Sequence, residues 1–286
     1  MINPTNKIEK LWVRNSTLFI EGLAYIQGYN SPAFSDLYKS LRLKNIQTKA
    51  KLEYGLGSLR RPELKSQTYK GRTYDYTASG TATKGLKGID ISQLETGIYE
   101  IGLSVSTNES DKQYSDLILA FHGLDKRSAD NWFEYRLYQK DRKTYLVKRS
   151  IIGRRVDDYS YIHIEKDWIN GRTFHIEGEF IIPGADLTDF TQGKYYLIMK
   201  KTVTQRQYAF ELGQIKQTGL GDKINNPFGD YNACYFATLK LEGINTTGFE
   251  LGEYELYVSL GYKSELFTGQ LNKQLKITIN DSCELI

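Results

Sequence analysis

The clearest pattern in the chain is an alternation of apolar residues with mostly polar or small ones, and it occurs twice. Apolar residues fill every second position of each run: Tyr99, Ile101, Leu103 and Val105 in the first, and Tyr254, Leu256, Val258 and Leu260 in the second. A period of two predicts a half-buried β-strand. Each run begins two residues after a glycine, Gly97 or Gly252. The sequence therefore predicts the same strand in two copies of one fold.

The repeat extends to the beginning of each copy. Residues 8–22 match residues 164–178, with Trp12 and Trp168 at the same place and an offset of 168 − 12 = 156. We expect a hairpin in each copy, with its turn at Asn15-Ser16 and at Asn170-Gly171. One parity of the second strand should face the core: Leu18, Ile20, Ala24 and Ile26, and in the other copy Phe174, Ile176, Phe180 and Ile182.

Comparison of the copies also resolves an ambiguous segment. Residues 35–43 have helical spacing, whereas their counterpart, residues 195–203, is rich in β-formers, so we predict strands in both. A last strand is expected at residues 116–122 and 271–279. Residues 132–149 indicate a further hairpin with a polar turn at Asp141-Arg142, and the sequence leaves open whether it completes the first domain or bridges the two.

These patterns predict an all-β chain of two tandem immunoglobulin-like β-sandwich domains that arose by internal duplication. The expected division is residues 1–125 for the first sandwich, 126–159 for a connecting hairpin or linker, and 160–286 for the second. Tyr99 and Tyr254 should form tyrosine corners, buried and hydrogen-bonded to upstream backbone. A length of 286 residues suits two domains, each with a core of its own.

Composition narrows the class of protein. A net charge of +4 is too small to indicate a nucleic-acid partner, and 22 tyrosines and 25 glycines against 5 prolines favour sheets joined by turns. We find neither a secretory leader nor an apolar run of the roughly 18 residues that a membrane span needs. The two cysteines, Cys234 and Cys283, do not form a disulfide framework. A cytoplasmic protein without a transmembrane segment is expected.

Signatures of enzymes are missing from the sequence. It has no Asp-x-Asp, no phosphate-binding glycine loop, no Gly-x-Ser-x-Gly and no His-Glu-x-x-His. The three histidines have no spacing typical of metal ligands, so we expect neither a metal nor a cofactor. The chain alone is therefore predicted not to be an enzyme, although a stand-alone enzyme that uses loop carboxylates is the rival class.

Two groups of residues are candidates for binding. A basic stretch could meet the phosphates of a polyanion, with an ordinary solvated face as the alternative; it comprises Lys140, Arg142, Lys143, Lys148 and Arg149. The middle loops, residues 51–73 and 212–230, differ between the copies, and tyrosines beside them could stack on sugars: Tyr69, Tyr74, Tyr76 and Tyr235. For the matched tryptophans a structural place in the core is favoured over a stacking platform.

Several segments resemble a known family. They are Ile20-Glu21-Gly22-Leu23-Ala24-Tyr25-Ile26-Gln27-Gly28, residues 41–45, Tyr74-Asp75-Tyr76, and residues 89–94 before Gly97 and Tyr99. They are similar to the tandem immunoglobulin-like C-terminal domains of bacterial wall teichoic acid glycosyltransferases and of glycerol- or ribitol-phosphate polymerases. The catalytic domain of such enzymes has no counterpart in this chain, so the resemblance carries over no catalytic residue.

The resemblance implies a non-catalytic accessory role in the biogenesis of an anionic cell-wall glycan. It implies self-association, with a trimer slightly preferred, and a place in the cytoplasm, peripheral to the inner face of the membrane. We place the oligomer contact at Tyr257, which alternation puts on the outer face of its strand. The alternative function is a stand-alone carbohydrate-binding or adhesin-like β-sandwich module.

Overall fold

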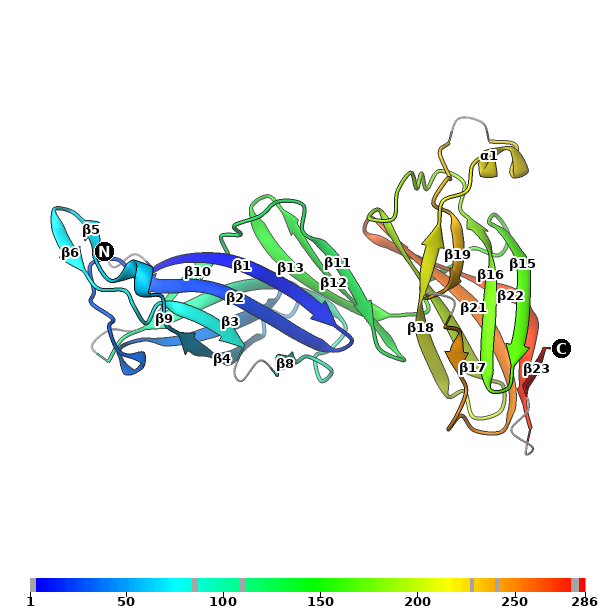
Figure 1. Ribbon diagram of the computed structural model, residues 1–286, viewed down its shortest axis with the longest axis horizontal. Helices are drawn as coiled ribbons and strands as arrows, with labels where there is room; N and C mark the ends of the chain where they lie inside the picture. The colour runs from blue at the N-terminus through cyan, green and yellow to red at the C-terminus, as the bar shows by residue number, and fades with distance from the viewer. Residues whose placement is uncertain are drawn as a thin grey trace. The chain divides into compact units, whose positions relative to one another are not determined.

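The computed structural model describes residues 4–83, 87–108, 112–226, 229–239, 242–278 and 283–285. The chain forms two compact units, Met1–Ser128 with Glu134–Arg149, and Ala129–Phe133 with Ser150–Ile286. Both are built almost entirely from β-strands, and the helical elements are single turns (Figure 1). The predicted all-β class and the sandwich architecture are confirmed.

In the first unit, one strand is shared by two layers. The strands are β1 (Pro4–Arg14), β2 (Thr17–Ile26), β3 (Tyr38–Asn45), β4 (Lys51–Leu59), β5 (Gln67–Tyr69), β6 (Arg72–Tyr74), β7 (Gly80–Thr83), β8 (Ile89–Asp90), β9 (Gly97–Ser106), β10 (Gln113–Asp116), β11 (Asp125–Ala129), β12 (Phe133–Lys140) and β13 (Lys143–Ser150). One layer has the order β1-β2-β7-β4 and the other β4-β3-β9-β13-β12-β11. Residues 51–55 of β4 pair with β3, and residues 56–59 pair with β7.

The second unit repeats this plan. Its elements are β14 (Arg154–Arg155), β15 (Tyr161–Asn170), β16 (Thr173–Ile181), β17 (Gly193–Lys201), β18 (Gln207–Ile215), α1 (Leu220–Lys223), β19 (Tyr235–Thr238), β20 (Ile244–Asn245), β21 (Gly252–Tyr262), β22 (Glu265–Ile277) and β23 (Cys283–Leu285). Here β18 is the shared strand, pairing with β17 and then with β19. Strands that pass from one sheet to the other close the corners of a sandwich.

The predicted core parity and tyrosine corners are present in both units. Leu18 and Ile20 of β2 are buried, as are Phe174 and Ile176 of β16. The Tyr99 hydroxyl donates to the Glu95 carbonyl over 2.8 Å, and the matching Tyr254 hydroxyl donates to the Glu250 carbonyl over 2.7 Å. The segments with helical spacing at 35–43 and their counterpart contain the strands β3 and β17, as the repeat predicted.

A glycine allows the first hairpin of each unit to bulge. The register of β1 with β2 shifts between Ile8 and Lys10, and that of β15 with β16 shifts at the matching place. Gly22 and Gly178 lie opposite these bulges, where a Cβ atom would overlap the backbone oxygen of Lys7 or His163. The repeated glycine of the two hairpins is therefore a requirement of backbone packing.

Three details of the predicted fold are wrong. The second hairpin turns at Gly171-Arg172, one residue later than expected, so the turns of the two copies match. The strand predicted at residues 116–122 is β10, residues 113–116; the chain then leaves β9 and crosses to β1, where the Ile8 amide donates to the Ile118 carbonyl. The tryptophans lie on the outer face: Trp12 is 37% exposed and stacks on Phe19, and Trp168 is 38% exposed and stacks on His175.

The hairpin β12–β13 completes the first unit. β10 pairs only with the C-terminal half of β9, so the N-terminal half has a free edge. β13 pairs with this edge and places Leu146 opposite Tyr99. In the second unit the long β22 stays on β21 and places Leu275 opposite Tyr254. The structural division of the chain thus differs from a separate linker at 126–159, because residues 134–149 belong to the first unit.

Candidate functional site in the first unit

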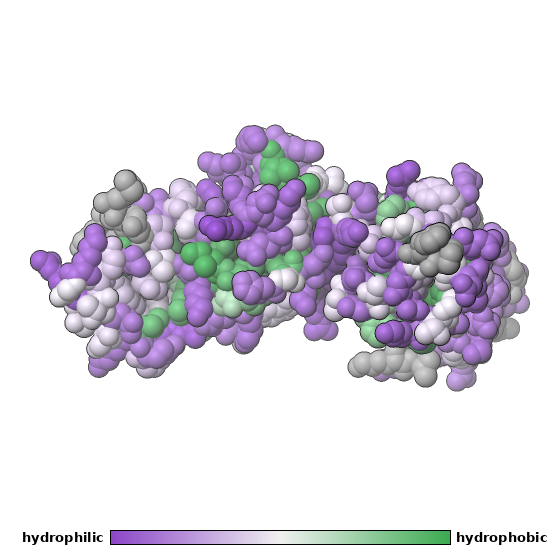
Figure 2. Space-filling model, turned by 90° about the horizontal axis from the view of Figure 1, so that it is seen from above, coloured by the Kyte–Doolittle hydropathy of each residue, from purple (hydrophilic) through white to green (hydrophobic). Residues whose placement is uncertain are grey.

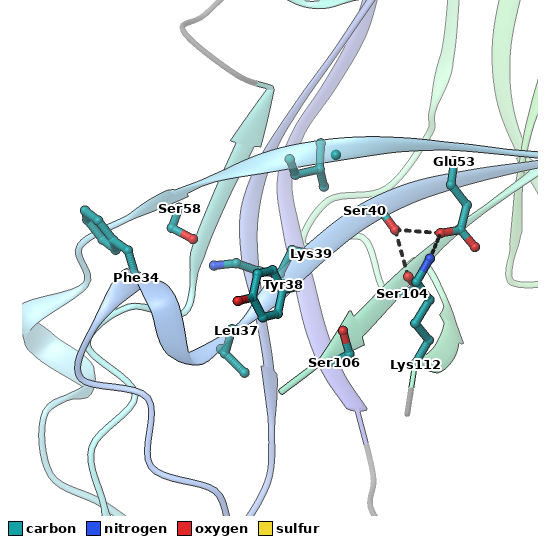
Figure 3. Close-up of a pocket in the computed structure, with 12 residues that line it drawn as sticks. Phe34, Leu37, Tyr38, Lys39, Ser40, Glu53, Ser58, Ser104, Ser106 and Lys112 are labelled. Carbon is teal, nitrogen blue, oxygen red and sulfur yellow. Dashed lines mark hydrogen bonds and ion pairs between the residues drawn. The ribbon is translucent and has the colours of Figure 1, made fainter. Parts of the chain in front are cut away.

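A cleft of about 460 Å³ opens on the first unit, where β4 turns away from β3 (Figure 3). The short helical turn before β3, the strands β3, β4 and β9, and the residue before β10 supply its walls. The lining residues are Phe34, Leu37, Tyr38, Lys39, Ser40, Glu53, Gly55, Leu56, Ser58, Ser104, Ser106 and Lys112. We call this cleft the β3–β4 groove. Its volume is in the range of about 300–1,000 Å³ that ligand pockets occupy.

The groove exists because two strands separate one residue pair earlier than their counterparts. In the first unit the pairing of β3 with β4 ends at Ser40 and Gly55. In the second unit the pairing of β17 with β18 continues to Tyr195 and Leu212, the positions that match Lys39 and Leu56. The duplication therefore provides an internal comparison, with the strands parted in one copy and paired in the other.

One end of the groove is polar and charged. Glu53 accepts hydrogen bonds from Lys112 over 2.6 Å, from Ser40 over 3.2 Å and from Tyr114 over 3.1 Å, and the hydroxyls of Ser40 and Ser104 are 2.7 Å apart. The hydrogen bond from Lys112 is the main reason that the pKa of Glu53 lies below its usual value. Glu53 is therefore ionised at neutral pH and acts as a hydrogen-bond acceptor.

The other end is aromatic. Phe34 and Tyr38 are 48% and 58% exposed, and the guanidinium of Arg60 lies 5.3 Å from the centre of the Phe34 ring. Within the described part of the chain, the hydroxyls of Ser58 and Ser106 make no hydrogen bond. Exposed rings beside unengaged hydroxyls can contact a ligand that has both apolar faces and hydroxyl groups.

Lys39 lies in the floor of the groove, at a position that alternation assigns to the core. The residue is 5% exposed, and its ammonium donates to the carbonyls of Ala78 over 2.9 Å and Gly80 over 2.7 Å. Burial lowers the pKa of Lys39 to about 8. At the matching position of the second unit, Tyr195 is fully buried and donates to the Phe180 carbonyl.

The basic residues predicted to bind a polyanion do not form one surface. Lys140 and Arg142 are exposed at and beside the β12–β13 turn, and Lys143 pairs with Glu100 over 3.1 Å. Lys148 is 3% exposed and donates to the carbonyls of Ser92 and Leu94, and Arg149 pairs with the buried Glu134 over 2.6 Å. Lys148 therefore ties the hairpin to the rest of its unit, and Arg149 ties the two strands of the hairpin to each other.

The four tyrosines predicted to stack on sugars divide into two pairs. Tyr69 and Tyr74 are partly exposed on the β5–β6 hairpin, with ring centres 6.4 Å apart. Tyr76 is 2% exposed and accepts a hydrogen bond from the Gly28 amide over 2.9 Å, and Tyr235 is 6% exposed. For Tyr76 and Tyr235 the prediction is wrong, because burial leaves neither ring a face on which a sugar could stack.

Tyr257, predicted to be an oligomer contact, is covered by its own chain. It does lie on the outer face of its sheet, but it is 6% exposed and packs with Ile151, Tyr196, Ile198 and Leu266. Its hydroxyl donates to Glu255 over 2.6 Å, and the Arg155 guanidinium lies 5.1 Å from the ring centre. The residues that follow β13 cover the face of the sheet that we predicted to contact a second copy of the chain.

The β3–β4 groove was missed in the sequence, although one signal was present. Lys39 is a charged residue in the apolar parity of a predicted strand, and its counterpart Tyr195 is aromatic. Exposed Phe34 has a counterpart, Phe190, which is 51% exposed, so the aromatic residue alone does not mark a groove. The difference between the copies at position 39 was the informative feature.

Two features are absent from the described residues. Among them, no three histidine, cysteine or acidic side chains are grouped so that they could hold a metal ion. Within the same residues, no helix has the length and apolar character needed to span a membrane.

Comparisons with known proteins give likeness in structure only. No protein-family description and no curated protein matches the sequence. Among solved structures, S. aureus TarS matches 94% of this chain with 11% identity and a TM-score of 0.38, and the chain spans 40% of the TarS chain. The chicken CNTN1 FN1-FN3 domains match 94% of the chain with 8% identity and a TM-score of 0.25, over 67% of their length.

Proposed function

We propose that this chain is a non-catalytic β-sandwich module that holds a glycan in the β3–β4 groove. The observation that carries the proposal is the combination of two exposed aromatic rings, Phe34 and Tyr38, with the hydroxyls of Ser58 and Ser106 in one open cleft. Sugars offer apolar C–H faces to aromatic rings and hydroxyl groups to polar side chains, so this lining suits them.

The polar end of the groove agrees with a hydrated ligand. On the face of the molecule that Figure 2 shows, hydrophilic residues predominate, and the hydrophobic residues gather mainly over the first unit. The polar end of the groove can exchange hydrogen bonds with sugar hydroxyls through Glu53, Ser40 and Ser104.

The same groove favours binding over hydrolysis. Glycoside hydrolysis ordinarily needs two carboxyl groups, one of them protonated to act as the acid. Glu53 is the one carboxylate among the described lining residues, and its lowered pKa disfavours the protonated form. We therefore assign Glu53 to ligand positioning.

We infer that the glycan belongs to a cell-wall polymer of the teichoic acid type and that the module serves an enzyme that extends or decorates this polymer. The support is the family resemblance of the sequence, together with exposed Lys140 and Arg142, which can meet phosphates outside the groove. The alternative is a stand-alone carbohydrate-binding module that uses the same groove. Self-association stays a prediction that sedimentation tests, and Tyr257 is no longer its contact.

A matched pair of variants tests glycan binding. Phe34→Ala removes a ring of the groove, whereas Phe190→Ala removes the equally exposed ring at the matching place in the second unit. We expect Phe34→Ala to weaken binding of cell-wall oligosaccharides by roughly fivefold to one-hundredfold, about 1–3 kcal/mol for a lost stacking contact. Phe190→Ala should bind like the wild type.

The measurement is calorimetric titration, with chromatography of the mixture to look for cleaved or elongated sugar. Equal affinity of all three proteins, or binding of no glycan by the wild type, would remove the groove as the site. Appearance of a new sugar product would contradict the non-catalytic assignment.

A further inference from the structure

The floor of the β3–β4 groove contains a positive charge without a counter-charge. Both described hydrogen bonds of the Lys39 ammonium go to neutral carbonyls, and no carboxylate of the described residues forms an ion pair with it. An ammonium has three N–H donors, so one donor is left over. A buried, unpaired charge costs several kcal/mol, and proteins normally compensate it with an opposite charge.

Packing alone does not require a lysine at this position. The second unit fills the matching place with Tyr195, which satisfies its hydroxyl with one carbonyl and leaves no charge in the core. The neighbouring residues change together with it: Ala24 and Thr81 of the first unit correspond to the buried Phe180 and Phe236 of the second. Only the copy with the smaller side chains combines the lysine with parted strands and a groove.

We propose that Lys39 is an anion subsite of the groove and that the glycan held there carries a carboxylate or phosphate group. The inference rests on the proposed function and adds that an anionic group of the saccharide lies inside the groove, at Lys39. An anionic oxygen that enters between β3 and β4 accepts the third N–H of Lys39. The hydroxyls of Ser58 and Ser106 are within the same lining and can donate to its other oxygens.

The charges of the groove agree with this assignment. The described lining contains two lysines and one glutamate, and Glu53 is already engaged by Lys112 at the far end (Figure 3). The positive charge of Lys39 is therefore not cancelled within the described lining. Since Lys39 is buried, its attraction for an anion is screened by salt much less than that of the exposed Lys140 and Arg142.

The test compares acidic and neutral ligands of the same size. Trigalacturonate and galactotriose form one pair, glucose 1-phosphate and glucose the other, and each is titrated against the wild type and the variant Lys39→Met. We expect the wild type to bind the acidic member of at least one pair roughly tenfold or more tightly, a preference that 0.5 M salt leaves largely intact. Lys39→Met should lose the preference, and Lys10→Met, which removes an exposed lysine of the same unit outside the groove, should keep it.

The outcomes separate this inference from the proposed function. Equal binding of acidic and neutral members, or a preference that survives in Lys39→Met, would overturn the anion subsite and leave glycan binding intact. Failure of the wild type to bind any of the four ligands, while neutral cell-wall oligosaccharides bind, would also overturn it. If no glycan of any kind binds, the proposed function falls and the inference with it.

A second measurement needs no variant. The Lys39 ammonium can be followed by NMR of lysine labelled at the carbon next to Nζ while inorganic phosphate or acetate is added. An anion at Lys39 stabilises the charged form, so the pKa of Lys39 should rise from about 8 towards 10.5. A titration of Lys39 that neither anion shifts would contradict the subsite, and a response to only one of them tells phosphate from carboxylate.

Discussion

Position 39 shows how one residue can change the chemistry of a repeated fold. A core position that holds an aromatic ring in the second unit holds an ammonium in the first, and its partners are the backbone carbonyls of Ala78 and Gly80. Alternation predicted that residue 39 points inward, because the period of a strand is fixed. The pairing of β3 with β4 stops at Ser40 for reasons of tertiary packing, so the groove that Lys39 lines could not be predicted from the pattern.

The pH dependence of stability measures the cost of this charge. The pKa of Lys39 is about 8 in the folded protein and 10.5 for an ordinary lysine. Below pH 8 both states are protonated, and the folded state bears the full cost of about 3 kcal/mol. Between these pKa values the unfolded chain holds a proton that the folded protein has lost, so the free energy of unfolding rises with pH.

We expect the free energy of unfolding of the first unit to rise by about 2 kcal/mol from pH 7.5 to 9.5 relative to Lys39→Met. Urea unfolding at several pH values gives this difference, and subtracting the variant removes contributions from other titrating groups. Below pH 7.5 Lys39→Met should be the more stable protein. Identical pH profiles for the two proteins would show that Lys39 is not a buried ammonium.

At the scale of elements, the hairpin β12–β13 illustrates what the sequence could predict and what it could not. Its two strands and the turn at Asp141-Arg142 were predicted, since they depend on local pattern, and both turn residues have positive φ. Its place beside β9 depends on where β10 leaves that strand. Contacts between residues far apart in the sequence decide that point, so the local pattern does not predict it. Of its basic residues, Arg149 is held by Glu134, so a charge pattern that indicated a ligand surface partly reflects internal ion pairs.

Glu134 joins three strands through a buried ion pair network. It is 0% exposed on β12 and accepts from Arg127 of β11 over 2.9 Å and from Arg149 of β13 over 2.6 Å. Glu134→Ala leaves two guanidinium groups without this partner, so we expect the first unit to lose about 3–5 kcal/mol of stability. Urea unfolding measures the loss.

The control is Glu100→Ala, which breaks the more exposed pair of β9 with Lys143 and should cost about 1 kcal/mol or less. Similar costs for the two variants would mean that solvent or other groups replace Glu134 in the network.

At the scale of the whole molecule, the duplication gives two cores that share a plan but differ at several matching positions. In the second unit Phe180, Tyr195 and Phe236 pack together, whereas the matching positions of the first unit hold Ala24, Lys39 and Thr81. The repeat made the class and order of strands predictable, because each copy constrained the interpretation of the other. The groove lies where the two copies differ. A pattern that both copies share cannot predict such a difference.

The tyrosine corners allow the two cores to be perturbed separately. Tyr99→Phe and Tyr254→Phe each remove one hydroxyl that donates to a backbone carbonyl, at a cost of about 1 kcal/mol. Because each unit has a core of its own, calorimetry should resolve two unfolding transitions. Tyr99→Phe should lower the midpoint of one transition by about 4 °C and leave the other in place, and Tyr254→Phe should do the reverse. A single transition that both variants lower equally would show that the two units unfold as one cooperative body.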